Sequence, residues 1–494
     1  MKKISLYLIL GVISLIIMPG CKKELTEHPT SFVAPSNFFQ TKDEDEAAVN
    51  GIYSVLYNFF SDWQFLEETD GTSDLMWVNV GTSFDGTFSY DPSAPGFGAS
   101  VWEYGYQGIL YANNTIYGIE HSPVDSTSKK SMIAEAKFLR ALYYFFLTNT
   151  FNGVPYWTFP LNTEDRVTQV SKLPRTDAGV IRDSLIADLK GCAGDLPLKQ
   201  TGANTGRVTQ GAALALLEKI ALFNKDWQTS IDAGEQIVKG GQYKLLPNYA
   251  DIFDTKNSAE SIFEIQYSYS VSGGIQRSQQ IPSYCMPGNH KSGTTIYDGV
   301  DLGTKAATTY GDIRPTHVLV GLYSDSTDTR KDVVLGYSYN GQEFNLYKTT
   351  GMPWLGPKFW DLSVINLASG KNLRYLRYAD VLLMLAEAYN ESGNTAKALT
   401  YLNQVRERSH IPDVVSTDQD SVRQIIRDER GRELAGEYQR RWDLIRWGIW
   451  YDALKETAKD NPNGAPNLEA YKQYYPIPEN EIIKNSNLKQ NPGY

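Results

Sequence analysis

The chain has 494 residues, of which 47 are Lys or Arg and 57 are Asp or Glu, so its formal net charge at pH 7 is −10. This acidic balance argues against a nucleic-acid partner, because binding to phosphates depends on clustered Lys and Arg side chains. The three cysteines are too few for a disulfide framework or a cysteine-rich zinc site, and whether Cys192 and Cys285 pair is left open.

The first twenty residues have the pattern of a secretory signal. Two lysines precede an apolar run over residues 4–18, which is shorter than the roughly 20 residues that a spanning helix needs. Cys21 follows in MPGC, where a bacterial lipoprotein signal would place the cysteine that becomes lipidated. Acyl chains on Cys21 would hold the protein on a membrane surface without spanning it. A plain secretory signal followed by an unmodified cysteine is the alternative.

The mature chain is expected to form one unit. A signal at 1–20 would be followed by a polar, lipid-anchored tether at 21–36, which contains two prolines. After the tether, no linker rich in Pro, Ser or charge interrupts the sequence. We therefore predict a single folded unit over residues 37–494.

Helical periodicity recurs along this unit. Residues 43–58, 131–148 and 209–238 contain apolar residues at helical spacing, and the last range has a short Asn-Lys-Asp turn between two helices. A further pair of helices is predicted around 421–456.

The clearest pair of helices lies in residues 373–409. Gly393 is suited to end its first helix, and Asn394 or Thr395 can cap its second. The pair resembles a tetratricopeptide unit, whose helices bury apolar surface on both sides. The predicted fold is therefore mainly α: a tetratricopeptide-repeat-like helical scaffold with a loop-rich insertion region that contains short strands.

Three stretches rich in glycine and aromatic residues interrupt the helices, at approximately 71–108, 266–310 and 336–360. Alternation in SIFEIQYSYS predicts short strands entering the second stretch. Loops of this length in a compact domain are usually functional or disordered, and the aromatic content argues against disorder. The three stretches are therefore the predicted ligand-binding loops.

The aromatic residues of these loops are suited to sugar binding. A planar ring offers an apolar surface to the C–H face of a pyranose, while nearby polar side chains can bind the hydroxyl groups. Trp77 and Trp354 lie among Gly, Pro and polar residues and are expected to be exposed, whereas Trp102 is expected to be structural. The remaining aromatic candidates for ligand contact are Phe84, Tyr90, Tyr284 and Tyr297.

Charged motifs give no sign of catalysis. The five histidines are scattered without metal-binding spacing, so no metal, cofactor or catalytic residue is predicted. The Arg-rich segment 423–446 alternates in charge, and pairs such as Asp428–Arg432 and Glu437–Arg441 have the i,i+4 spacing of structural ion pairs. Paired carboxylates of a glycoside hydrolase cannot be recognised from sequence, because they need only be close in space.

Several motifs together resemble the SusD/RagB family of outer-membrane lipoproteins from Bacteroidetes, over the whole of residues 21–494. The strongest are IRDERGRELAGEYQRRWDLIRWG at 426–448 and the terminal YYPIPENEIIKNSNLKQNPGY. Further matches are AEAKFLRALYYFFLTNTFNGVPYWT at 134–158, GRVTQGAALALLEKIALFNKDW at 206–227 and LRYADVLLMLAEAYNESGN at 376–394.

The resemblance implies a function and a set of partners. It implies a non-enzymatic lipoprotein at the surface of the outer membrane that captures nutrient, most often a glycan or oligosaccharide, and caps a SusC-like TonB-dependent transporter. It also places Asp74 near the position where glycan-binding members supply a polar anchor. Two alternatives remain open: a RagB-like version of the same role that captures peptides, and a structural docking protein of tetratricopeptide type.

Overall fold

A computed structural model describes residues 38–269, 277–288, 294–303, 309–347 and 350–494. The predicted signal, the tether and Cys21 lie outside these residues, as do parts of two predicted ligand-binding loops. Within the described ranges, no helix combines the length and the apolar character that a membrane crossing requires. Cys192 and Cys285 are both buried and do not pair with each other.

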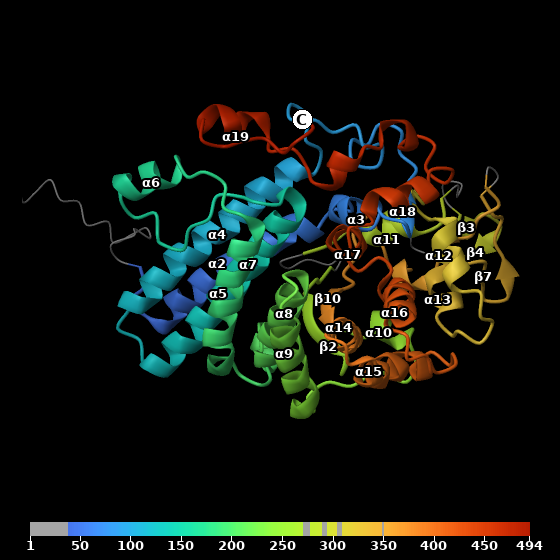
Figure 1. Cartoon of the computed structure of the whole chain (residues 1–494), viewed down its shortest axis with the longest axis horizontal. Helices are drawn as coiled ribbons and strands as arrows, with labels where there is room; N and C mark the ends of the chain where they lie inside the picture. The colour runs from blue at the N-terminus through green and yellow to red at the C-terminus, as the bar shows by residue number, and fades with distance from the viewer. Residues whose placement is uncertain (1–37, 270–276, 289–293, 304–308, 348–349) are drawn as a thin grey trace, which may run out of the picture.

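The fold is mainly helical. Consecutive helices pack as pairs, α4 with α5, α8 with α9 and α14 with α15, and α7 and α9 join one pair to the next (Figure 1). The strands lie mostly in the loop-rich part at the right of Figure 1. The α-helices are α2 (Lys42–Phe60), α3 (Gln64–Thr69), α4 (Gly98–His121), α5 (Ser126–Phe151), α6 (Glu164–Val170), α7 (Ala178–Cys192), α8 (Gln210–Phe223), α9 (Trp227–Gly240), α10 (Asp251–Asp254), α11 (Ile281–Cys285), α12 (His317–Leu322), α13 (Lys331–Val334), α14 (Tyr378–Glu391), α15 (Thr395–Arg408), α16 (Gln419–Leu434), α17 (Arg440–Arg446), α18 (Trp450–Glu456) and α19 (Glu479–Lys484).

The described strands form antiparallel pairs: β1 with β5, β2 with β10, β3 with β4, β6 with β9 and β7 with β8. The strands are β1 (Met76–Val78), β2 (Ser261–Ile265), β3 (Ile296–Tyr297), β4 (Val300–Asp301), β5 (Ile313–Pro315), β6 (Leu335–Gly336), β7 (Ser338–Tyr339), β8 (Gln342–Glu343), β9 (Trp354–Leu355) and β10 (Leu373–Arg377). The short 3-10 helices are η1 (Ala193–Asp195), η2 (Gly202–Asn204), η3 (Pro357–Phe359), η4 (Ala465–Asn467) and η5 (Ala470–Gln473).

Local sequence signals explain the scaffold. Helix α2 begins with a capping box, in which Thr41 accepts a hydrogen bond from the Glu44 N–H and the Glu44 carboxylate accepts one from the Thr41 N–H. Helices α4 and α5 approach closely at Gly108, where a Cβ atom would lie 2.3 Å from the ring of Tyr143. The prediction of helices at 43–58, 131–148 and 209–238 is confirmed.

The pair predicted at 373–409 is confirmed except at its beginning. Gly393 has a φ of +87°, and Asn394 caps α15 by accepting a hydrogen bond from the Lys397 N–H at 3.2 Å. Residues 373–377 are not helical but form β10, which pairs with the strand predicted in SIFEIQYSYS. A short apolar run fits both the helical period and the alternation of a strand, and here the pairing with the distant strand β2 favours the strand.

Two further expectations about helices were wrong in part. The predicted loop 71–108 is helical from Gly98 onward, where α4 begins, and Trp102 is buried in that helix as expected. The region around 421–456 forms α16, α17 and α18 instead of one pair of helices, because the chain leaves the helical path after Leu434.

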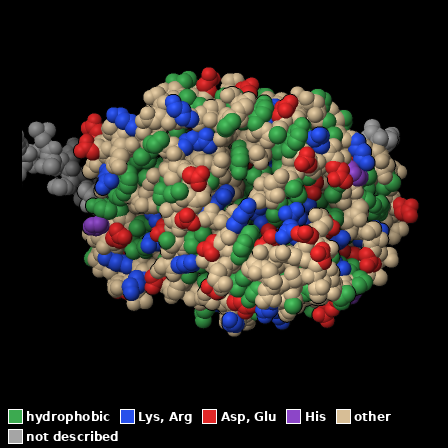
Figure 2. Space-filling model, viewed as in Figure 1, with side chains coloured by type: hydrophobic (Ala, Val, Ile, Leu, Met, Phe, Trp, Pro, Cys, Tyr) green, Lys and Arg blue, Asp and Glu red, His purple; other side chains and the backbone are tan. Residues whose placement is uncertain are grey.

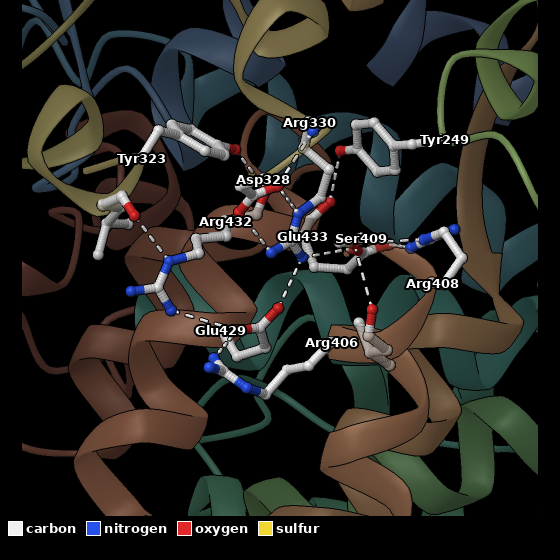
Figure 3. A network of polar contacts seen from close by, with 12 residues as sticks. Tyr249, Tyr323, Asp328, Arg330, Arg406, Arg408, Ser409, Glu429, Arg432 and Glu433 are labelled. Atoms are coloured by element: carbon white, nitrogen blue, oxygen red, sulfur yellow. Dashed lines mark hydrogen bonds and ion pairs between the residues drawn. The ribbon is translucent and has the colours of Figure 1, made fainter. Parts of the chain in front are cut away.

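A buried ionic network joins this region to the scaffold (Figure 3). Glu433 on α16 is its centre: its carboxylate binds Arg330 at 2.8 Å and Arg377 at 2.6 Å, and it also binds Arg408. Arg330 additionally binds Glu429 at 2.6 Å. The side chains are almost fully buried, so every charge needs a partner nearby.

The structural role predicted for the Arg-rich segment is confirmed, but the two i,i+4 pairs were wrong. Arg432 pairs with Glu429 at 3.2 Å instead of Asp428. Glu437 and Arg441 are not on one helix, because residues 435–439 separate α16 from α17. Glu437 therefore binds Arg377 and Lys358, while Arg441 donates to Thr72 and to main-chain carbonyls.

The C-terminal segment packs across the early part of the chain. The Tyr90 hydroxyl donates to the Lys472 carbonyl at 2.6 Å, across 382 positions of sequence. The Tyr475 hydroxyl donates to Asp85 at 2.7 Å, and the Lys472 ammonium donates to the Phe88 carbonyl at 2.6 Å. Residues 85–90 are therefore held in place by residues 472–475, in the red segment along the top of Figure 1.

Candidate ligand-binding site

Asp74 and Tyr90, two predicted ligand contacts, lie in the interior. The Asp74 carboxylate accepts two hydrogen bonds from Arg440, at 2.8 and 2.7 Å. The Tyr90 ring stacks on Tyr475 with centroids 4.4 Å apart, and burial raises the pKa of Tyr90 to about 12. Both side chains hold distant segments together in this structure, and their contact with ligand stays a prediction.

Trp77 and Trp354 pack against strand β5 and the turn before it. Trp77 is paired with Arg314 across β1 and β5, and the Arg314 guanidinium lies 5.5 Å from its ring. Trp354 packs on Tyr347 at 4.0 Å, and a Cβ atom at Gly311 would come within 2.2 Å of the Trp354 ring. The expectation that both tryptophans are exposed was wrong: they are buried, so they support the segment 309–315 and do not present a ring to solvent.

Tyr284 belongs to a row of aromatic side chains that reaches the surface. Trp63 stacks on Tyr284 with ring centroids 4.5 Å apart and an interplanar angle of 16°. Tyr310 follows on from Tyr284 at 5.0 Å and is 44% exposed, while the other two residues are half-buried. We call these three residues the aromatic ladder (Trp63, Tyr284 and Tyr310).

Three separate segments supply the ladder. Trp63 lies in the turn between α2 and α3, where its main-chain N–H donates to the Asp62 carboxylate. Tyr284 is on α11, a single helical turn that has Pro282 at its start. The Tyr310 N–H donates to the Ser283 carbonyl at 2.8 Å, which ties the third ring to the second.

Carboxylates lie close to the ladder. Burial raises the pKa of the Tyr284 hydroxyl to about 12, and the negative charges of Asp62 and Asp312 add to the effect. Burial also raises the pKa values of both carboxyl groups, although the charge of Arg314 opposes this at Asp312. The Tyr284 hydroxyl thus stays protonated, and Asp62 and Asp312 are near enough for their charges to raise its pKa.

The polar surroundings of the ladder extend to the loop after β1. The Asn79 N–H donates to the Asp312 carbonyl at 2.8 Å, so this loop borders the segment 309–315, which carries Tyr310. A partly exposed row of rings flanked by carboxylates is chemically suited to a ligand with apolar C–H faces and hydroxyl groups.

The other two predicted residues are placed differently from each other. Phe84 is 49% exposed on the loop after β1. Tyr297 is buried on β3, and its hydroxyl interacts with Thr309, directly before the ladder residue Tyr310. Of the predicted site residues, the segment 309–315 brings together Trp77, Tyr284, Tyr297 and Trp354.

Trp63 and Tyr310 were not among the predicted site residues. Trp63 follows the first helix in the sequence SDWQ and lies outside the three predicted ligand-binding loops. Tyr310 is the last residue of the second predicted loop, but it was not chosen as a site residue. A sequence signal was available for both residues: Trp63 follows Asp62, and Tyr310 precedes Gly311, so each is an aromatic residue next to an acid or a glycine. In the ranges that the structure describes, no three His, Cys, Asp or Glu side chains are arranged to hold a metal ion.

Comparisons with known proteins show which proteins this chain is similar to. The family model described as the SusD family matches residues 357–494, and the model described as starch-binding associating with outer membrane matches residues 61–222. SusD-like protein P25 of Formosa agariphila is 28% identical, over 96% of this chain and 97% of the relative.

Solved structures have the same fold. A SusD homolog from Bacteroides thetaiotaomicron superposes with a TM-score of 0.78 at 24% identity, covering 93% of this chain and 98% of that one. A structure described as a laminarin binding SusD-like protein has a TM-score of 0.75 at 25% identity, covering 92% of this chain and all of the other. The helical scaffold seen here is therefore the scaffold of these proteins.

Proposed function

We propose, from the premise that this chain belongs to the SusD/RagB family, that it binds a glycan at the cell surface through the aromatic ladder. The observation that carries the proposal is the stack of Trp63, Tyr284 and Tyr310 beside Asp62 and Asp312. Two descriptions support the ligand class: starch binding for one family model and laminarin binding for one structural neighbour.

The proposal includes a place in the cell. Lipidated Cys21 would hold the protein on the outer membrane, in accord with the family-model description that mentions this membrane. There it would cap a SusC-like TonB-dependent transporter and pass its ligand inward. One family model and one structural neighbour are described by the glycan that they bind, which supports a binding protein that is not an enzyme.

Calorimetry tests the ladder directly. A soluble form lacking residues 1–21 is titrated with laminarin, starch and other polysaccharides, and with a mixture of peptides. Trp63→Ala is expected to lower the affinity for the bound glycan by about tenfold, because it removes a partly buried ring from the stack. Tyr111→Ala is the matched control, since Tyr111 is an aromatic residue on α4 that is 39% exposed and lies outside the ladder.

The outcomes separate the candidate roles. Binding of peptides without any saccharide would replace the glycan with a peptide ligand. No binding of either class, together with unchanged nutrient uptake on gene deletion, would favour a structural docking role. Equal effects of Trp63→Ala and Tyr111→Ala would show that the ladder is not the binding site.

Cell fractionation tests the anchor and the transporter. Cys21→Ala is expected to release the protein from the outer membrane, whereas Cys192→Ala is the control, because Cys192 is a buried thiol. Copurification of the transporter with the wild-type protein would support the capping role, and its absence under mild detergent would count against it.

A further inference from the structure

A cavity lies beside β10, away from the ladder. Its volume is about 770 Å³, within the range of about 300 to 1,000 Å³ that is usual for ligand sites. Residues from α10, β7, β10 and the segment between η3 and β10 line it, and no ladder residue is among those lining residues. The cavity is therefore a candidate site of its own.

Three cations line this cavity, and main-chain carbonyls hold each of them. Arg374 donates to the carbonyls of Asn372 at 2.8 Å and Phe253 at 3.0 Å. Lys371 donates to the Trp360 carbonyl at 2.8 Å, and Lys256 donates to the Tyr267 carbonyl at 2.7 Å. A carbonyl fixes the position of a cation but does not neutralise its charge. The positive charges are therefore positioned and only partly balanced.

Two aspartates, Asp254 and Asp361, also line the cavity, so its lining holds three cations and two carboxylates. Glu264 Oε1 lies 3.7 Å from Arg374 Nε, beyond hydrogen-bond distance, and this buried Nε has no hydrogen-bond partner. Asp254 lies 3.5 Å from Lys371, but its side chain is 75% exposed to water. Asp361 accepts hydrogen bonds from Ser363 and Ser369.

Burial shifts the pKa values of all three cations. Burial and the adjacent charge of Arg374 lower the pKa of Lys371 to about 8, although the charges of Asp254 and Asp361 oppose the shift. Burial likewise lowers the pKa values of Arg374 and Lys256, although the charge of Glu264 opposes both shifts. An anionic group in the cavity would stabilise all three charged forms.

Aromatic side chains complete the lining. Trp360 and Tyr339 meet edge to face with centroids 5.4 Å apart, and Phe253 and Tyr269 add two further rings. Apolar walls beside cations suit a ligand that combines C–H faces with a negative charge.

We propose that this cavity, which we call the cationic cavity, binds an acidic sugar unit, one bearing a carboxylate or a sulfate ester. The cations would pair with the anionic substituent, and the aromatic rings would contact the sugar ring. The site does not depend on the ladder, so the protein would hold an acidic glycan at two separate places.

Calorimetry with charged and neutral oligosaccharides tests the proposal on the soluble form lacking residues 1–21. Oligogalacturonate supplies carboxylates, carrageenan oligosaccharides supply sulfate esters, and laminari-oligosaccharides supply neither. At least one acidic probe is expected to bind, with an affinity that falls as salt is added. Lys371→Gln is expected to lower that affinity by about tenfold or more and to leave neutral-sugar binding unchanged, because the loss of one close charge pair commonly has this size.

Matched variants separate this site from the ladder. Lys256→Gln is expected to act in the same direction as Lys371→Gln, whereas Lys239→Gln removes an exposed lysine on α9 and is expected to have no effect. Melting curves establish that each variant is folded. Trp63→Ala should keep acidic-sugar binding at the cavity, so failure of the ladder proposal and failure of this one give different patterns.

Three results would overturn the proposal. The first is binding of neither acidic probe. The second is an acidic-sugar affinity that Lys371→Gln and Lys256→Gln leave unchanged in folded variants. The third is binding of an acidic peptide at the cavity in place of both acidic oligosaccharides.

Discussion

Arg374 and Arg377 lie three residues apart on the same strand, and their surroundings differ in a way that separates two regions of the molecule. Arg377 belongs to the ionic network and binds Glu437 and Glu433 at 2.6 Å and Glu260 at 2.8 Å. Arg374 faces the cationic cavity and binds main-chain carbonyls. Burial lowers the pKa of both residues, but the carboxylates around Arg377 reverse the shift and raise it.

The difference shows how one strand serves both stability and binding. A buried arginine surrounded by carboxylates stays charged, but its charge is already compensated by them and is not available to a ligand. A buried arginine held by carbonyls keeps its charge at the edge of a cavity. On the face shown in Figure 2, Lys and Arg are interspersed with Asp and Glu, so charge on that face is balanced at the surface as it is in the ionic network.

The largest effect is expected for Arg377→Met, which would remove the one cation that Glu260, Glu433 and Glu437 share and leave more buried negative charge than the remaining cations balance. The free energy of unfolding should fall by about 3 to 5 kcal/mol, measured by urea denaturation. Arg423→Met is the control, because the Arg423 side chain is 27% exposed, and it should change the stability by less than about 1 kcal/mol. A similar loss of stability in the two variants would contradict the distinction between buried and partly exposed ion pairs.

Arg374→Met is expected to have a smaller effect on folding and a larger one on binding. It leaves neutral carbonyls unpaired, so the stability should fall by about 1 to 3 kcal/mol. Acidic-sugar binding, measured by calorimetry on the folded variant, should be lost. A stability loss equal to that of Arg377→Met would remove the contrast between the two arginines.

The buried ion pairs of Asp443 should make the free energy of unfolding depend on pH, by about 2 kcal/mol. Burial would raise the pKa of Asp443, but the charges of Arg430 and Arg446 reverse this and lower it to about 2. Because the folded-state pKa lies below the unfolded value, the stabilisation is present above about pH 4 and is lost as the pH falls toward 2. Asp443→Asn should therefore be less stable than the wild type by about 2 kcal/mol at pH 7, and the gap should narrow in denaturation experiments at pH 2.

The smallest effect is expected at the exposed end of the ladder. Tyr310→Ala should weaken glycan binding by about 1 kcal/mol, or roughly fivefold, with little change in melting temperature, because Tyr310 is largely at the surface. Tyr310→Phe keeps the ring and should bind nearly as well as the wild type. If Tyr310→Phe bound as weakly as Tyr310→Ala, the hydroxyl would be the important group.

The helices were predictable because each has its own local signals. Gly393 and Asn394 mark the turn between α14 and α15, and apolar spacing marks the helices on either side. Strand β10 was not predicted, because its identity depends on β2, more than a hundred residues earlier. Local patterns therefore identify elements whose stability is local.

The candidate site was less predictable for the same reason. Asp74 and Tyr90 look exposed in a glycine-rich loop, but their partners Arg440 and Lys472 are more than 350 positions away. Tyr284 was predicted, whereas its stacking partner Trp63 comes from a different loop. A row of rings from three segments has no pattern in any one of them.

The contact between residues 85–90 and 472–475 has a consequence for the order of events in biosynthesis. Asp85 and Tyr90 find their hydrogen-bond partners only after the ribosome has made almost the whole chain. Closing a loop of this length costs entropy and slows folding. The helices can form while the chain is being synthesised. The contacts between residues 85–90 and 472–475 can form only after residues near the C-terminus have been made.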